Sequence, residues 1–319
     1  MAPFFSAMTS KKQSQGLPKG PHPDNAHRDG YDFSALVASH PPLKPFVRAN
    51  AYGNLSIDFA LPEAVKALNC ALLKHHYGIS RWDIPKGFLC PPIPGRVDYL
   101  HHLEDLLRQT PGTDGLPLLD IGTGANGIYA LLAASRFGRA VVATDIAKAS
   151  LTNVATILKA NPGLEKRISL RFQSNPRHIL TGVTQTNEQF AACVCNPPFH
   201  ASAAEAALGT NRKLEGLAKS RGQRHISGPG KPQTLNFGGQ DAELWCDGGE
   251  RSFLLRLIDE SARLPDLCVW FTTLVSKSDN LRPCKRRLEQ RGASEIKVIE
   301  MQQGQKITRI LAWRFESVT

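Results

Sequence analysis

The sequence predicts an α/β fold, in which a seven-stranded Rossmann-like sheet with a C-terminal antiparallel hairpin follows a small helical N-terminal subdomain. Three features support this prediction. From Leu116 onward, short apolar runs alternate with helix-length segments, which is typical of βαβ units and a parallel sheet. A glycine-rich turn follows the first of these runs. The last two runs, within residues 295–315, are joined by a turn near Gly304, so at least one of them must be antiparallel to its neighbour.

The composition limits the classes of protein to consider. The 319 residues, 41% of them hydrophobic, can bury a substantial core, and no apolar run approaches the length that crosses a bilayer. The first residues lack the order of a secretory signal, so we expect a cytoplasmic protein. Seven scattered cysteines and the absence of HxxxH or HExxH patterns indicate reduced thiols and no metal site. The net charge of +11 favours a polyanionic partner such as nucleic acid, although charge also serves solubility alone.

Two regions precede the predicted sheet. Residues 1–30 are polar and rich in Lys, Pro and Gly, which predicts a flexible arm. Residues 31–113 predict the helical subdomain, with leucines at helical spacing in residues 61–78 and 97–110. The first of these helices is expected to end at Gly78. We interpret the histidine pairs, His75-His76 and His101-His102, as surface residues of these helices.

Residues 114–319 are predicted to form the sheet domain. Besides the terminal hairpin, strands are expected in the apolar runs 116–122, 140–146, 168–174, 191–198 and 267–276. A long basic insertion at about 205–240 interrupts this scheme and is a lid, a binding loop or a disordered segment. Its candidate contacts to nucleic acid are Arg212, Lys213, Lys219, Arg221, Arg224 and Lys231. We interpret a second basic segment, residues 284–292, as a solvated helix face.

Polar and glycine residues follow the first three strands. Gly122, Gly124 and Gly127 form a GxGxxG turn that admits a ligand close to the backbone, a pattern shared with NAD-binding folds. Asp120 favours S-adenosylmethionine instead, because a carboxylate there attracts an ammonium group and repels a pyrophosphate. Asp145 ends the second strand, where it can accept hydrogen bonds from ribose hydroxyls. Gln173 follows the third strand, where the adenine of a nucleoside cofactor is expected.

The fourth strand ends in Asn196-Pro197-Pro198-Phe199. An exocyclic adenine amine is a poor nucleophile because its lone pair is delocalised into the ring. The Asn196 side-chain oxygen and the Pro197 carbonyl oxygen can accept its two N–H groups and favour a pyramidal nitrogen. Pro197 and Pro198 stiffen the loop, which preorganises these acceptors, and Phe199 offers a ring for stacking. The same loop can hold a side-chain amide, so protein glutamine methylation stays an alternative.

Longer motifs are more specific. The chain resembles the bacterial 23S ribosomal RNA (adenine 1618-N6) methyltransferase family in the segments LDIGTGANGIY, CNPPFH, LNFGGQDAELWCDGGE and WDIPKGFLCPPIPGRVDYLHHLEDLL. It is also similar, over most of its length, to the human methyltransferase-like enzyme that acts on U6 small nuclear RNA. The resemblance implies a class I S-adenosylmethionine-dependent methyltransferase fold, to which the seven strands and terminal hairpin also point.

The resemblance further implies S-adenosyl-L-methionine as cofactor, N6-methyladenosine as product, and 23S ribosomal RNA or a large-subunit assembly intermediate as partner. By matching motifs, Arg96, Gly122 and Asp145 contact the donor, and residues 196–199 hold the target base. The alternatives are the glutamine N5-methyltransferase, an RNA-binding assembly factor with a vestigial donor pocket and, more distantly, an NAD-dependent enzyme. The oligomeric state is left open.

Overall fold

A computed structural model describes residues 20–198, 246–303 and 306–316 of the chain. The N-terminal elements are α1 (Phe33–Ser39), η1 (Pro41–Phe46), β1 (Val47–Ala49), β2 (Leu55–Ile57), α2 (Pro62–Tyr77) and α3 (Ile93–Arg108). The next are β3 (Leu118–Ile121), α4 (Ile128–Arg136), β4 (Val141–Asp145), α5 (Lys148–Lys159), α6 (Pro162–Glu165), β5 (Ile168–Phe172) and β6 (Phe190–Cys195). The last are α9 (Gly249–Ser261), β7 (Cys268–Val275), η2 (Ser278–Asn280), α10 (Leu281–Gln290), β8 (Glu295–Gln303) and β9 (Lys306–Arg314).

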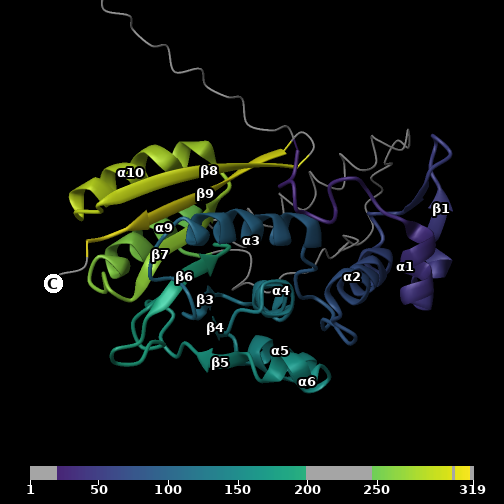
Figure 1. Cartoon of the computed structure of the whole chain (residues 1–319), viewed down its shortest axis with the longest axis horizontal. Coiled ribbons are helices and arrows are strands. Elements are labelled where there is room, and N and C mark those ends of the chain that lie inside the picture. Colours follow the sequence, from purple (N-terminus) through teal and green to yellow (C-terminus); the bar gives the residue numbers. More distant parts are fainter. Residues whose placement is uncertain (1–19, 199–245, 304–305, 317–319) are drawn as a thin grey trace, which may run out of the picture.

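Seven of these strands form one twisted sheet in the order β5-β4-β3-β6-β7-β9-β8 (Figure 1). The five strands β3 to β7 pair in parallel, while β9 runs antiparallel to both β7 and β8. This arrangement confirms the predicted sheet and its antiparallel C-terminal hairpin. The strand order reverses between β3 and β6, which makes their carboxyl ends the topological switch point of the sheet, where open α/β folds bind ligands.

The central strands β3, β4, β6 and β7 are buried on both faces, which explains why they are apolar runs. Alternate side chains enter two cores. Leu118 and Val194 share one core with α2, α3 and α4, and Leu119 and Cys193 share the other with α9 and α10. Since successive side chains of a strand point to opposite faces, helices pack on both sides of the sheet.

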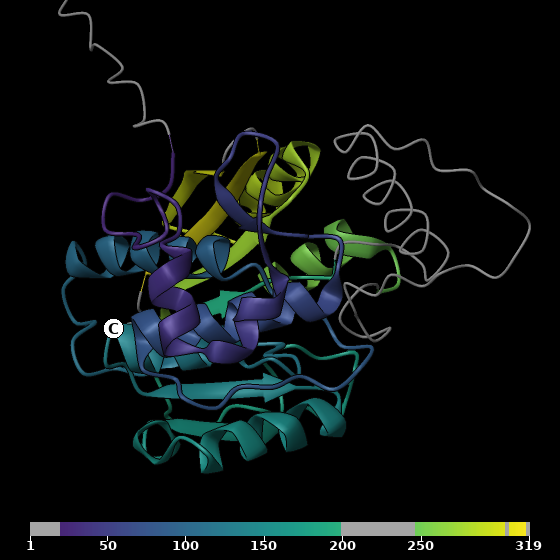
Figure 2. The ribbon, with the colours of Figure 1, turned by 90° about the vertical axis from the view of Figure 1, so that its right-hand side faces the viewer.

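The N-terminal elements agree with the helical prediction in part. Helix α2 covers the predicted stretch and ends at Gly78, whose φ of 67° gives the left-handed cap. The hairpin β1–β2 was not predicted, because three-residue strands are too short to show an alternating pattern. Figures 1 and 2 show α1, α2 and this hairpin gathered at one end of the molecule. The apolar side of α2 and α3 shares its core with the sheet, and the division into subdomains stays a prediction.

Residues 20–30, the end of the predicted arm, pack against α3 through polar contacts. The backbone N–H of His22 and the Asn25 side chain both donate to Asp98 Oδ1, at 2.7 and 2.8 Å. His101 on α3 is buried, with its ring stacked 5.0 Å from that of His22. The flexible-arm prediction is therefore wrong for residues 20–30, and the surface prediction is wrong for His101, because buried polar partners fix both. Residues 1–19 lie outside the described chain.

Within the described residues, no helix has the length and apolar character needed to cross a membrane.

Candidate active site

The sheet register brings the predicted site residues to one edge. Ile121 pairs with Cys195 on the neighbouring strand, so Gly122 and Asn196 leave the switch point side by side. On the other side of β3, Asp145 ends β4 and pairs with Phe172, after which Gln173 follows. A cavity at this edge is lined by Gly122, Asp145, Gln173 and Asn196, together with Ile121 and Cys195. The pattern of strand endings alone predicted this convergence.

The three glycines of the turn have different roles. All three adopt left-handed conformations, with φ of 71° at Gly122, 63° at Gly124 and 60° at Gly127. A Cβ atom on Gly127 would approach Val154 Cγ1 to 3.1 Å, so this glycine permits close packing of α4 against α5. A Cβ on Gly122, by contrast, would meet no heavy atom within 4 Å and would stand in open space at the cavity.

Asp145 links the turn to the second strand. Its Oδ2 accepts the backbone N–H of Gly124 at 2.8 Å, and its Oδ1 accepts that of Ala147 at 2.7 Å. Burial raises the pKa of Asp145, while these two N–H donors lower it. The carboxylate lines the cavity, and each of its oxygens retains acceptor capacity for a ligand hydroxyl.

Asp120 lies deeper than predicted. It is only 1% exposed and is not among the residues that line the cavity. Neither carboxylate oxygen makes a hydrogen bond of ordinary geometry within the described chain. Burial raises its pKa to about 7 and the nearby Asp145 raises it further, while the Thr123 side chain, the Ala130 backbone and Arg96 lower it. A buried carboxylate without a partner destabilises the protein, and a cation bound nearby relieves that cost.

Arg96 enters the cavity from α3. Its Nη1 donates to the Tyr129 hydroxyl at 2.9 Å, and its guanidinium lies 5.5 Å from the centre of the Tyr129 ring. Both residues line the cavity. Nothing in the sequence marked Tyr129, since one aromatic residue in the first turn of an apolar helix is typical of a core.

The strand exit at Asn196 presents an acceptor. Asn196 Oδ1 is buried and has no hydrogen-bond partner in the described part of the chain. Asn196 and Pro198 line the cavity, whereas Pro197 is buried and is not among the lining residues. Phe199 lies outside the described residues, as do all six basic residues predicted to bind nucleic acid in the insertion.

Gln173 holds the loop that forms another wall. Its Nε2 donates to the Thr181 carbonyl at 2.9 Å, and its Oε1 accepts the backbone N–H of Asn175 at 3.0 Å. The carboxylate of Glu260 on α9 fixes the same loop by accepting the backbone N–H groups of residues 179–181. Each end of the Gln173 amide therefore holds this loop, which fixes the shape of the wall, and each end retains capacity for one further hydrogen bond.

Helix α9 closes the cavity with two residues that sequence reasoning missed. Phe253 and Arg256 line it, and the Arg256 guanidinium lies 5.9 Å from the Phe253 ring centre. They follow the long insertion, so no strand ending pointed to them. The only available indication was that Phe253 and Arg256, three residues apart, lie on the same side of a helix.

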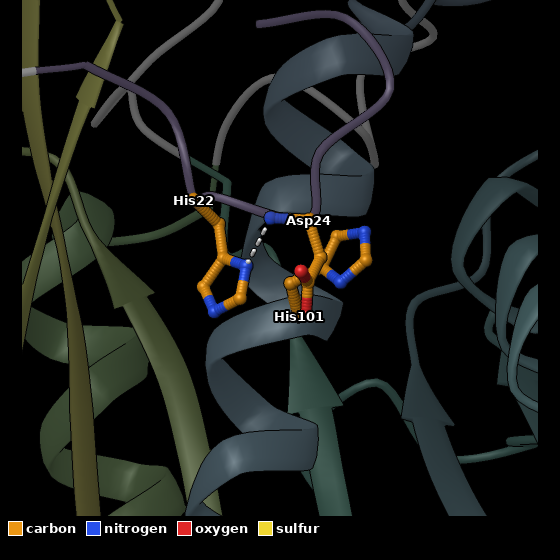
Figure 3. A group of neighbouring side chains, drawn as sticks. All are labelled: His22, Asp24 and His101. Atoms are coloured by element: carbon orange, nitrogen blue, oxygen red, sulfur yellow. Dashed lines mark hydrogen bonds between the residues drawn. The ribbon is translucent and has the colours of Figure 1, made fainter.

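One group of side chains has the composition of a metal site. Ligand atoms of His22, Asp24 and His101 lie within 4.8 Å of one another (Figure 3). However, His22 Nδ1 accepts the Asp24 backbone N–H at 3.1 Å, and Nε2 lies 2.9 Å from Asp105 Oδ2. An Nδ1 that accepts leaves Nε2 as the protonated donor, so neither nitrogen of the neutral ring is available to a metal. The group therefore fastens residues 20–30 to α3.

The cavity residues fit S-adenosylmethionine. Asp145 suits the ribose hydroxyls, and Asp120, buried next to the cavity-lining Ile121, is a carboxyl group that an ammonium group would hold in its ionised form. Because Gly122 has no side chain, the space beside its Cα is open to a ligand in the cavity. The residues therefore offer complementary groups to the amino-acid and nucleoside parts of this donor.

Comparison with known proteins decides the family. A family model described as RNA methyltransferase matches residues 15–317. The chain belongs to this RNA methyltransferase family. Its most similar relatives include "Ribosomal RNA large subunit methyltransferase F" of Shewanella denitrificans, which is 54% identical over 98% of this chain and 90% of that protein. The protein of the same name from Shewanella baltica is 55% identical over 94% of this chain and 82% of its own length.

Solved structures of human METTL16 resemble this RNA methyltransferase. Its catalytic domain in complex with the MAT2A 3'UTR hairpin 1 has a TM-score of 0.77 and 31% identity, covering 94% of this chain and 97% of that one. Its N-terminal domain in complex with SAH has a TM-score of 0.72 and 28% identity, and the match covers 94% of this chain and 100% of that domain's chain. The class I methyltransferase fold predicted for the chain is thereby confirmed.

Proposed function

We propose that this RNA methyltransferase methylates the N6 amine of adenine 1618 in 23S ribosomal RNA, acting in the cytoplasm on the RNA or on a large-subunit assembly intermediate. The observation that carries the proposal is the buried Asn196 Oδ1, which lacks a partner in the described chain and lies beside Gly122. An acceptor in that position suits an N–H donor of a planar substrate. The names of the Shewanella relatives support ribosomal RNA as the substrate.

The cofactor is S-adenosylmethionine, which supplies an electrophilic methyl group. We assign Asp120, Gly122 and Asp145 to holding it, and Arg96 with Tyr129 to shaping the wall. Because Arg96 lowers the pKa of Asp120, it favours the ionised carboxylate that an ammonium group requires.

Asn196 acts on the target amine. Its Oδ1 accepts one N–H and the Pro197 carbonyl oxygen accepts the other, which directs the nitrogen lone pair toward the donor. Proline has no backbone N–H to compete for these acceptors, and its fixed φ keeps them in place before the substrate arrives. Phe199 is proposed to stack on the base. The target adenine must leave its stack to reach the site, which costs a few kcal/mol.

Methylation of purified, unmodified large-subunit ribosomal RNA with labelled donor tests the proposal. Wild-type protein is expected to label the RNA, and nuclease rather than protease treatment should release the label. The Asn196→Ala variant is expected to reduce kcat by about 10²-fold or more, because a preorganised acceptor is lost. Its affinity for SAH should be unchanged. Label that resists nuclease and yields to protease would instead indicate glutamine methylation.

A further inference from the structure

A second hollow lies between α9 and α10, outside the active site. Four of the residues that line it are arginines, Arg251 from α9 and Arg282, Arg286 and Arg287 from α10. Leu255, Pro283 and Gln290 complete the lining. We call it the arginine groove. The sequence interpretation of the α10 segment as a solvated face overlooked Arg251, which is distant in the chain.

The arginine groove is preformed. Cys284 and Leu288 of α10 are fully buried in the core that contains Leu254 and Leu257 of α9. Asp259 on α9 accepts from Arg291 Nε at 2.8 Å, just beyond the end of α10. These contacts fix α9 and α10 against one another, and Figure 1 shows the two helices at the same end of the sheet. A ligand would therefore meet arginines that are already gathered.

Most of the positive charge in the groove is uncompensated. Asp259 lies 3.6 Å from Arg287 Nε, and it partly neutralises that arginine. Among the described residues, no carboxylate forms an ion pair with Arg251, Arg282 or Arg286, and all three are exposed. The carboxylate of the neighbouring Glu250 bonds elsewhere, because it accepts the backbone N–H groups of Ser276 and Lys277 and the side-chain amide of Asn280. Three clustered guanidinium groups therefore face solvent, and a guanidinium fork matches phosphate oxygens.

The groove and the active site flank the same helix. At 3.6 residues per turn, Arg251 and Leu255 lie on the side of α9 roughly opposite Phe253 and Arg256, which line the active-site cavity. The two sites are thus separated by about the width of one helix, ~10 Å. A nucleic-acid strand bound in the groove therefore needs only a few nucleotides to reach the active-site side of α9.

We propose that the arginine groove between α9 and α10 binds the phosphate backbone of the substrate RNA next to the target adenine. The proposal rests on the proposed function for its RNA. Phosphate contacts carry no sequence information, but they orient the strand and recover the free energy of unstacking the base. The groove therefore contributes to RNA affinity and leaves the chemistry at Asn196 unchanged.

The test is a triple variant of the full chain, Arg251→Gln, Arg282→Gln and Arg286→Gln. Its Kd for unmodified large-subunit ribosomal RNA should rise about tenfold or more at moderate salt. The slope of log K against log salt should become shallower by about two units, as three phosphate contacts are lost. SAH affinity and kcat at saturating RNA should match those of wild type. The matched control removes three exposed lysines outside α9 and α10, Lys74→Gln, Lys159→Gln and Lys166→Gln.

The outcomes separate the two proposals. If the triple variant and the control bind RNA with equal affinity and equal salt slope, the groove proposal is overturned. If the triple variant melts below wild type, the single variants Arg251→Gln and Arg282→Gln, each at an exposed position, decide by the same binding measurement. A wild-type protein that binds this RNA without methylating it would overturn the proposed function, and the groove would still be judged by affinity alone.

Discussion

Asp120 connects stability and donor binding at a single residue. Burial raises its pKa to about 7, whereas an aspartate in an unfolded chain titrates near about 4. The folded protein thus binds this proton more tightly than the unfolded chain does. Without donor, the free energy of unfolding should therefore fall as the pH rises from about 4 to about 7. A bound ammonium group reverses the preference, because it favours the ionised carboxylate.

The variant Asp120→Asn separates these effects. It remains neutral at every pH, so its Tm without donor should exceed that of wild type, and by more at pH 8 than at pH 5. Its affinity for SAH should fall about tenfold at pH 8, in line with the loss of a nearby opposite charge. Thermal unfolding and calorimetry at both pH values measure the two changes. A variant with an unchanged Tm and unchanged affinity would show that Asp120 has no charged role.

Site residues at strand ends could be predicted from the sequence, whereas site residues on helices could not. The positions of the Gly122–Gly127 turn, Asp145, Gln173 and Asn196 were predictable because each lies at the end of a strand or directly after it, and parallel strands end at one edge. Tyr129, Phe253 and Arg256 were not, because they lie on helices whose neighbouring turns look like ordinary core or surface. Their role depends on tertiary packing, which the local pattern does not encode.

At the scale of elements, α9 joins the site to its surroundings. Its Phe253 and Arg256 line the cavity, while Glu260 accepts three backbone N–H groups of the loop after β5. Buried donors left without an acceptor are costly. Helix α9 therefore fixes the wall that Gln173 also holds.

The variant Glu260→Gln tests this role. The amide retains one acceptor oxygen but loses the charge and the second acceptor, so the free energy of unfolding should fall by about 1 to 3 kcal/mol. The affinity for SAH should weaken because the wall is less fixed. Urea unfolding and calorimetry measure both quantities. Glu289→Gln, at an exposed position of α10, is the control and should change stability by less than about 0.5 kcal/mol. Equal stabilities of the two variants would contradict the assignment.

The elements also differ in how well sequence predicts them. The strands β3, β4, β6 and β7 appear as apolar runs because both of their faces are buried. The hairpin β1–β2 was missed because its three-residue strands show no alternation. Its turn is held instead by the backbone N–H groups of Tyr52 and Asn54, which donate to Asn50 Oδ1. The burial of residues 20–30 was missed for a similar reason, because Asp98 on a distant helix satisfies their polar groups.

At the scale of the whole molecule, the fold combines the cavity at the switch point, the Asn196 acceptor at its edge and the positively charged arginine groove. The net charge of +11 was compatible with solubility alone, and it gains a specific role if the arginine groove binds phosphate. In the proposed mechanism the two sites have different roles. Asn196, Pro197 and Pro198 are proposed to select the amine, and the groove is proposed to hold the strand that carries the target adenine.

The central claim is that this RNA methyltransferase places a methyl group on the N6 amine of adenine 1618. Mass-spectrometric mapping of N6-methyladenosine in 23S ribosomal RNA, from cells with and without the protein, tests it most directly. We predict that the modification at this adenine is absent without the protein, returns with wild type and does not return with Asn196→Ala. An unchanged modification at this position in cells that lack the protein would contradict the account.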